Sequence, residues 1–259
     1  MADPGGMANQ RERITRLTMM PSTGRSVLDP VPRLILAVDV EGSTLRTNLM
    51  KGELRRIMYA LLDRALRGTG IDRKHLEQPV DRGDGVLLLF RPDDEVPKTL
   101  LLGQFVPRLA ALLVEHNATV AEPALRLRLR VVFHAGEIHD DGWGFYGEDL
   151  DVAFRLLDAP SVKKALKNEP AFPLVLVVSD EIHSGIVRHG YVDVGPYAGS
   201  VRVSVAKRRR RGWVHFPLPL PVSRVKPSSR VHALVIAAPG TSGTATADEL
   251  ALVTATEGH

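Results

Sequence analysis

Three short runs of consecutive apolar residues constrain the fold of this chain more than any other feature. They are Leu34–Val38, Val86–Phe90 and Leu174–Val178. Each run has the length of a β-strand, and an unbroken apolar run of that length indicates a strand buried in a sheet. We therefore expect a sheet in the interior of the protein, with the other elements arranged around it.

Segments with helical spacing lie between these strands. Apolar residues recur at helical spacing from Met50 to Ala65, and glycines soon after this segment end the helix. Two further helices are predicted, one from Pro97 to His116 and one from Glu148 to Leu166. These helices alternate with the strands, as they do in domains that combine helices with one sheet.

Two more segments complete the expected sheet. Residues Leu125 to Phe133 alternate leucine with arginine, which is typical of a strand with one solvent-exposed face. The segment from Val201 to Phe216 has the pattern of a hairpin. The order of elements predicts the α+β class, with helices packed on one face of a largely antiparallel sheet.

The two ends of the chain differ from this ordered middle. We expect a disordered arm over residues 1–30, one domain over residues 31–221, and a flexible tail over residues 222–259. The arm is rich in proline and glycine, and the tail in serine, threonine, alanine and glycine. Within the tail, Val231 to Ala238 is apolar and long enough to add one strand.

Composition excludes several classes of site. There are no cysteines, which rules out disulfides, cysteine zinc sites and thiol nucleophiles and agrees with a reducing cytoplasm. The apolar share of 44%, the charged share of 25% and the net charge of +4 are ordinary for a soluble protein. No apolar stretch is long enough for a bilayer and no secretory pattern is present, so we expect a cytoplasmic protein without a membrane partner.

Two aspartates lie at predicted strand ends. Asp39 follows the first strand, and Asp84 lies in the turn Gly83–Gly85 directly before the second. Carboxylates at neighbouring strand ends can share a hard divalent cation such as Mg²⁺ or Mn²⁺. Either motif alone is also an ordinary turn sequence, because aspartate and glycine favour turns. Their occurrence together favours a metal site.

Other motifs follow in a fixed order. Val131–Glu137 ends in His-Ala-Gly-Glu, Tyr146–Leu156 reads Tyr-Gly-Glu-Asp-Leu-Asp-Val-Ala-Phe-Arg-Leu, and Val178–Ile182 leads from a strand into a helix. Together with Asp39–Thr44 and Gly83–Gly85, they make residues 33–217 similar to a class III adenylyl or guanylyl cyclase domain. The resemblance implies a ferredoxin-like (βαββαβ) cyclase fold with an additional C-terminal helix and hairpin.

The resemblance also implies an activity. A nucleoside triphosphate would become a 3′,5′-cyclic nucleotide and pyrophosphate, through attack of the ribose 3′-hydroxyl on the α-phosphate with two divalent cations, Mg²⁺ or Mn²⁺. The implied metal ligands are Asp39, Asp84 and the backbone carbonyl of Val40. The implied assembly is a homodimer with its active sites between the subunits.

Further residues are implied to act on the nucleotide. Asp151 and Arg155 would reach the site from the other subunit as catalytic residues, with Arg155 stabilising charge in the transition state. The implied nucleotide contacts are Gly42, Ser43, Thr44 and Lys207. Lys207 also begins the basic run Lys207–Arg211, which is equally explained by a solvated turn. No nucleic-acid motif accompanies that run, so we expect no nucleic-acid partner.

Three positions depart from the family pattern. Residue 151 is aspartate where active members usually have asparagine, and the positions that read the base are Val80 and Gly144, which offer no polar side chain. The base therefore stays open between adenine, guanine and a pyrimidine, the last as in phage-defence cyclases. A catalytically silent homologue that binds a nucleotide or only dimerises is the alternative. The diguanylate cyclase signature is absent, and the spacing of His134 and His139 does not favour zinc.

Overall fold

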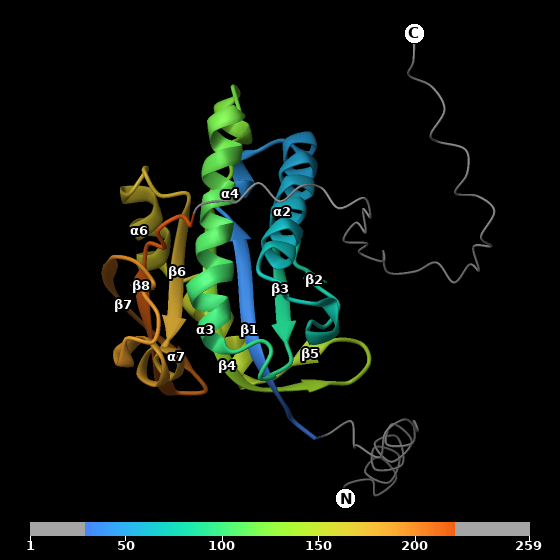
Figure 1. Cartoon of the computed structure of the whole chain (residues 1–259), viewed down its shortest axis with the longest axis vertical. Coiled ribbons are helices and arrows are strands. Elements are labelled where there is room, and N and C mark those ends of the chain that lie inside the picture. Colours follow the sequence, from blue (N-terminus) through green and yellow to red (C-terminus); the bar gives the residue numbers. More distant parts are fainter. Residues whose placement is uncertain (1–28, 221–259) are drawn as a thin grey trace, which may run out of the picture.

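The computed structural model describes residues 29–220, which form an eight-stranded sheet with helices on both sides (Figure 1). The strand order is β2-β3-β1-β4-β6-β8-β7, with β5 paired to β4. Among the pairings in this part of the chain, β4 and β6 run parallel and the others antiparallel. The strands are β1 Val31–Val40, β2 Val80–Asp81, β3 Gly85–Phe90, β4 Leu129–Asp140, β5 Phe145–Tyr146, β6 Leu174–Ser179, β7 Tyr197–Val205 and β8 Arg208–His215.

The helices connect these strands. They are α2 Asn48–Gly68, α3 Lys98–Leu100, α4 Val106–Thr119, α5 Glu148–Leu157, α6 Pro160–Asn168 and α7 Asp180–Gly185. A π-helical turn, Leu101–Phe105, joins α3 to α4. No helix within residues 29–220 combines the length and apolarity needed to cross a membrane. The predicted terminal arm and tail, including the expected strand at Val231–Ala238, lie outside the described residues, so the domain boundaries stay a prediction.

The hydrophobic core consists of two clusters, one on each face of the sheet, because helices cover both faces. In β1, Leu34 and Leu36 pack in the cluster formed with α2 and α4, whereas Ile35 and Ala37 pack in the cluster formed with α5 and α6. The expectation of helices on one face was therefore wrong. Strands that are apolar at every position require two covered faces, since successive side chains point to opposite sides.

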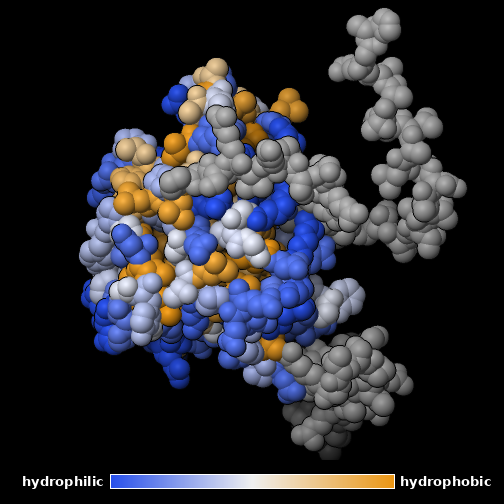
Figure 2. Space-filling view, viewed as in Figure 1, coloured by the Kyte–Doolittle hydropathy of each residue, from blue (hydrophilic) through white to orange (hydrophobic). Residues whose placement is uncertain are grey.

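The helices on the first face are amphipathic. Figure 1 shows α2 and α4 side by side in front of the sheet, and the space-filling view of this face shows hydrophilic and hydrophobic residues interspersed on its surface (Figure 2). The apolar residues of α2 that recur at helical spacing, such as Leu54, Met58 and Leu61, are buried. The helical period therefore predicted which side of α2 meets the sheet.

Several predicted elements have different bounds, and two of the differences have a local cause. The expected helix from Glu148 to Leu166 is divided into α5 and α6, and α6 begins at Pro160, because proline lacks an N–H group and suits the first turn of a helix. The strand expected from Leu125 begins at Leu129. The backbone N–H and carbonyl of Leu127 bond the side chain of Asn117, at 2.8 and 2.9 Å, in place of a neighbouring strand.

Candidate active site

The register of the central strands brings the two predicted metal ligands together. β1 pairs with β3 so that Asp39 lies opposite Gly85, and the backbone N–H of Val40 donates to the carbonyl of Asp84 over 3.0 Å. A side chain at Gly85 would overlap the carbonyl oxygen of Val38, so only glycine allows this close approach. Asp39 and Asp84 therefore lie close together at the ends of neighbouring strands, as the sequence predicted.

Asp39 contacts an arginine that the sequence analysis did not single out. Arg130 lies directly opposite Asp39 in the pairing of β1 with β4, and its guanidinium forms an ion pair with the Asp39 carboxylate. Both side chains are largely buried. Burial lowers the pKa of Arg130, and the nearby charge of Asp158 opposes that shift. The sequence signal was the alternating arginines of this segment, which we interpreted only as a solvent-exposed face.

Asp84 has a different environment. Its Oδ2 accepts a hydrogen bond from the hydroxyl of Ser43, a buried residue in a short 3₁₀ helix that follows Gly42. Within residues 29–220, no lysine, arginine or histidine forms an ion pair with Asp84. Asp39 is thus in direct contact with a cation, whereas the direct side-chain contact of Asp84 is a neutral hydroxyl, and Arg55 acts on its charge only from a greater distance.

A cavity of about 370 Å³ opens between these aspartates and α5, and we call it the aspartate cavity. It brings together six of the predicted site residues: Asp39, Val40, Gly42, Ser43, Thr44 and Asp84. Its walls also carry residues that we did not predict: Arg82, Arg130, Phe154, Asp158 and Lys163. Three carboxylates and three cationic side chains therefore line one space.

The remaining predicted residues lie elsewhere on this chain. Asp151 and Arg155 are exposed on α5, and the described residues show no ion pair between them. Lys207 is exposed in the turn between β7 and β8, with a positive φ of 63°. None of the three lines the aspartate cavity. Their predicted action on a nucleotide in a partner subunit stays a prediction.

A buried hydrogen-bond network fixes the start of α5. His134, inside β4, bonds through Nδ1 to the hydroxyl of Ser179 at 2.8 Å and through Nε2 to Asp149 at 3.2 Å. Asp149 also accepts from the backbone N–H of Glu137, and the hydrogen bond from His134 is the main cause of its lowered pKa. The His134 ring is thus used to hold α5 against the sheet, and His139 stacks on Tyr146 instead of joining it.

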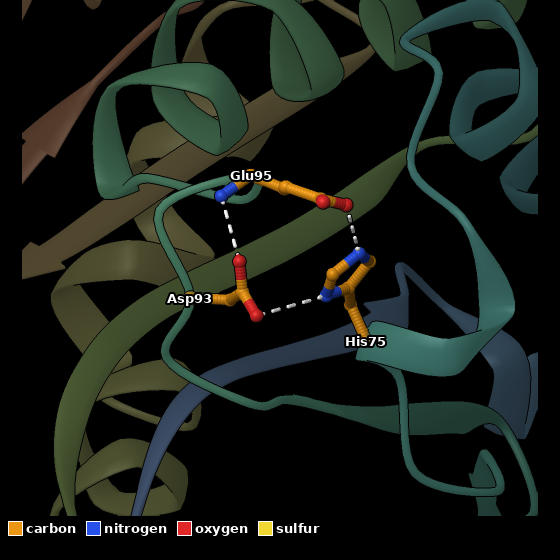
Figure 3. A group of neighbouring side chains, drawn as sticks. All are labelled: His75, Asp93 and Glu95. Carbon is orange, nitrogen blue, oxygen red and sulfur yellow. Dashed lines mark hydrogen bonds and ion pairs between the residues drawn. The ribbon is translucent and has the colours of Figure 1, made fainter.

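A second polar cluster lies beyond the other end of β3 (Figure 3). His75 places Nε2 at 2.9 Å from Glu95 and Nδ1 at 3.6 Å from Asp93, so its ring lies between two carboxylates. Lys74 is 2.8 Å from the same Glu95 oxygen as His75, and hydrogen bonds from Lys74 and then His75 lower the pKa of Glu95. The three side chains have metal-ligating chemistry, but Lys74 already pairs with Glu95, and the His75 ring contacts both acids.

Comparison with solved structures identifies the fold. The guanylyl cyclase Cya2 matches with a TM-score of 0.51 and 16% identity over 76% of this chain and 98% of that chain. An adenylate/guanylate cyclase/hydrolase from Silicibacter pomeroyi matches with a TM-score of 0.52 and 20% identity, over 73% of this chain and 98% of that one. No family model and no curated protein matches the sequence. The chain has the fold of a class III nucleotidyl cyclase catalytic domain, as the sequence motifs predicted.

Proposed function

We propose that this protein is a nucleotidyl cyclase that converts a nucleoside triphosphate into a 3′,5′-cyclic nucleotide and pyrophosphate with two divalent cations. One observation carries the proposal. In a fold shared with cyclases, Asp39 and Asp84 lie at the same end of neighbouring strands and line one cavity, where Asp84 forms no ion pair with any described residue.

The donor atoms suit a hard divalent cation. A buried oxygen of Asp39 accepts no hydrogen bond, although it contacts the Arg130 guanidinium, and Asp84 offers a second carboxylate beside it. We propose Asp39, Asp84 and the backbone carbonyl of Val40 as ligands of Mg²⁺ or Mn²⁺. When bound, such cations lower the pKa of an attacking hydroxyl and offset charge on phosphate oxygens.

Arg130 is placed to assist with the phosphates. Its Nε is buried without a hydrogen-bond partner in the described part of the chain, so the protein does not use this donor. A guanidinium also has enough donors to face Asp39 and a phosphate together. The aspartate cavity itself balances three carboxylates with three cations, which suits a nucleotide whose charge is largely offset by its own metal ions.

We further propose that a homodimer completes each site. Asp151, Arg155 and Lys207 are exposed and lie outside the aspartate cavity of their own chain, so a second copy is needed to bring them to it. Arg155 would then supply positive charge to the transition state, Asp151 would accept from a ribose hydroxyl, and Lys207 would contact the triphosphate.

Mixing variants tests this arrangement. Asp39→Ala and Arg155→Ala are each expected to be inactive alone. In a mixed dimer, one of the two sites has both residues intact, so mixing the variants after subunit exchange should restore measurable activity. Failure to restore any activity, in a mixture that native mass spectrometry shows to contain mixed dimers, would refute the shared site.

The central experiment is an assay with each of the four nucleoside triphosphates and Mn²⁺, with cyclic products identified by mass spectrometry. Asp39→Ala and Asp84→Ala should each abolish product, and EDTA should do the same. Asp93→Ala, at the other end of β3, is the matched control and should retain activity. No product from any nucleotide at high protein concentration would refute the enzyme and favour a silent, nucleotide-binding homologue. The same assay identifies the base, which Val80 and Gly144 leave open.

A further inference from the structure

Arg82 differs from the other two cations of the aspartate cavity because it has no acidic partner. Arg130 pairs with Asp39, and the Lys163 ammonium lies 3.3 Å from a carboxylate oxygen of Asp158. The Arg82 guanidinium instead lies over the ring of Phe154, 3.7 Å from its centroid. Within residues 29–220, its side chain makes no hydrogen bond and no ion pair. All of its N–H donors therefore remain free.

Both partners of this stack are fixed to walls of the cavity. The backbone N–H of Arg82 donates to the carbonyl of Gly85 over 3.0 Å, which closes the turn that carries Asp84. Phe154 projects from α5, and its half-buried ring packs against the second core cluster. An aromatic face holds a guanidinium by its plane and leaves the N–H groups at its edges directed outward. Phe154 thus orients Arg82 without using any of its donors.

We infer that Arg82 binds the polyphosphate chain of the nucleotide, with Phe154 as its positioning residue; this rests on the proposed function. The charges of the cavity give the reason. Once Asp39 and Asp84 hold divalent cations, Lys163 keeps its partner Asp158, but carboxylates no longer balance Arg82 and Arg130, and the cavity favours an anion. A polyphosphate supplies that charge, whereas a nucleobase is neutral and does not. The planar guanidinium also matches pairs of phosphate oxygens.

The position is distinct from the residues that the sequence motifs indicated. Arg82 lies two residues after Val80, in the turn before Asp84, and Phe154 directly precedes Arg155. The quoted motifs therefore leave out Arg82, and they contain Phe154 without giving it a role. Val80 occupies a position that reads the base in the cyclase family, so an arginine this close to it has one competing role, which is to contact the edge of the base. The experiment must separate this role from phosphate binding.

Inorganic tripolyphosphate with Mn²⁺ is the probe, because it has no base and requires no catalysis. Isothermal titration calorimetry on the full chain should show that Arg82→Gln weakens binding by about ten- to hundredfold, the usual loss for a hydrogen bond to a charged group. Arg82→Lys should fall between this variant and the wild type. Phe154→Leu, which keeps an apolar side chain, should weaken binding less than Arg82→Gln and should raise KM more than it lowers kcat.

Arg188→Gln is the matched control. Arg188 is also exposed and also forms no ion pair within the described residues, but it does not line the aspartate cavity. Its substitution should leave tripolyphosphate affinity unchanged. Thermal melts of each variant verify that the fold is intact, which we expect because Arg82 is exposed.

The outcomes separate this inference from the proposed function. Equal tripolyphosphate affinity in the wild type and Arg82→Gln would overturn it, and so would the absence of any tripolyphosphate binding by the wild type. A change in the preference among nucleotides, with unchanged tripolyphosphate affinity, would show that Arg82 reads the base and would also overturn it. Binding that depends on Arg82 in a protein that makes no cyclic product would support the inference and refute the cyclase.

Discussion

The two ends of β3 each gather acidic side chains, yet they differ in how the acids are neutralised. Beyond the last residue of the strand, His75 lies between Asp93 and Glu95, and Lys74 meets Glu95 as well. Before the first residue, Asp39 pairs with Arg130, whereas Asp84 forms no ion pair among the described residues and contacts the hydroxyl of Ser43, and a cavity of about 370 Å³ opens beside it. Carboxylates that lie close together do not by themselves define a metal site. The aspartate end is distinguished by a carboxylate that forms no ion pair and lies beside an open cavity.

The largest effect on stability is expected from the buried ion pair at the aspartate end. Arg130→Gln leaves the Asp39 carboxylate largely buried without its cation, so the free energy of unfolding should fall by about 3–5 kcal/mol. Urea unfolding measures this loss. The double variant Asp39→Asn with Arg130→Gln should recover most of it, because no buried charge is then left unpaired. A loss well under 1 kcal/mol in the single variant would show that the pair is not effectively buried.

The next change tests Asp84, the aspartate that forms no ion pair among the described residues. Asp84→Asn retains an acceptor for the Ser43 hydroxyl, so we expect little loss of stability, but the formation of cyclic product should fall by at least about a hundredfold. Mn²⁺ should raise the Tm of the wild type and not that of this variant. Asp93→Asn is the control with the same chemical change at the other end of β3. Equal losses of activity in both variants would remove the distinction between the two ends.

A smaller effect is expected at the histidine cluster. His75→Ala leaves the two carboxylates without their shared partner, and the free energy of unfolding should fall by about 1–3 kcal/mol. Cyclase activity per folded molecule should not change. Lys74→Ala removes an exposed partner of Glu95 and should lower the free energy of unfolding much less than His75→Ala. Restoration of His75→Ala activity by added metal would instead indicate a metal site here.

The smallest effect concerns pH and the neighbour of Asp84. Hydrogen bonds, first from Arg55 and also from the Gly83 backbone and Tyr59, lower the pKa of Asp81 from 3.8 to about 2. A pKa below the unfolded value means that ionised Asp81 stabilises the fold above pH 3.8, and that this contribution is lost as the pH falls toward about 2. The pair is one third exposed, so its contribution should be about 0.2–1 kcal/mol.

Asp81→Asn isolates this contribution. Urea unfolding of the wild type and the variant should differ at pH 6, and the difference should shrink from pH 4 downward as Asp81 becomes protonated. A constant difference over that range would show that ionisation of Asp81 does not stabilise the fold. Together, Asp81→Asn and Asp84→Asn compare two neighbouring aspartates. Asp81 forms an ion pair with Arg55, whereas Asp84 forms no ion pair among the described residues.

The residues that the sequence placed correctly belong to local patterns. Asp39 and Asp84 were predicted because each lies at the end of an apolar run, where glycines mark the turn. The loop Gly42–Thr44 follows directly from Asp39, so its place beside the aspartates required no knowledge of distant segments. The helical spacing of the apolar residues also predicted where α2 lies and which of its sides is buried. The sequence also contained the signal for the break between α5 and α6, which is Pro160. We predicted one helix because the apolar residues continue at helical spacing beyond this proline.

Other features depended on contacts between segments far apart in the chain. Arg130 reaches Asp39 only because β4 pairs with β1 in one register, and a shift of a single residue would turn its side chain to the other face. Arg82 meets Phe154 only where the β2–β3 turn approaches α5. The sequence by itself therefore predicted the three buried strands and the position of Asp39 and Asp84 at strand ends. The tertiary structure decided which cations neutralise which acids, because charge balance is set by register and packing and not by spacing along the chain.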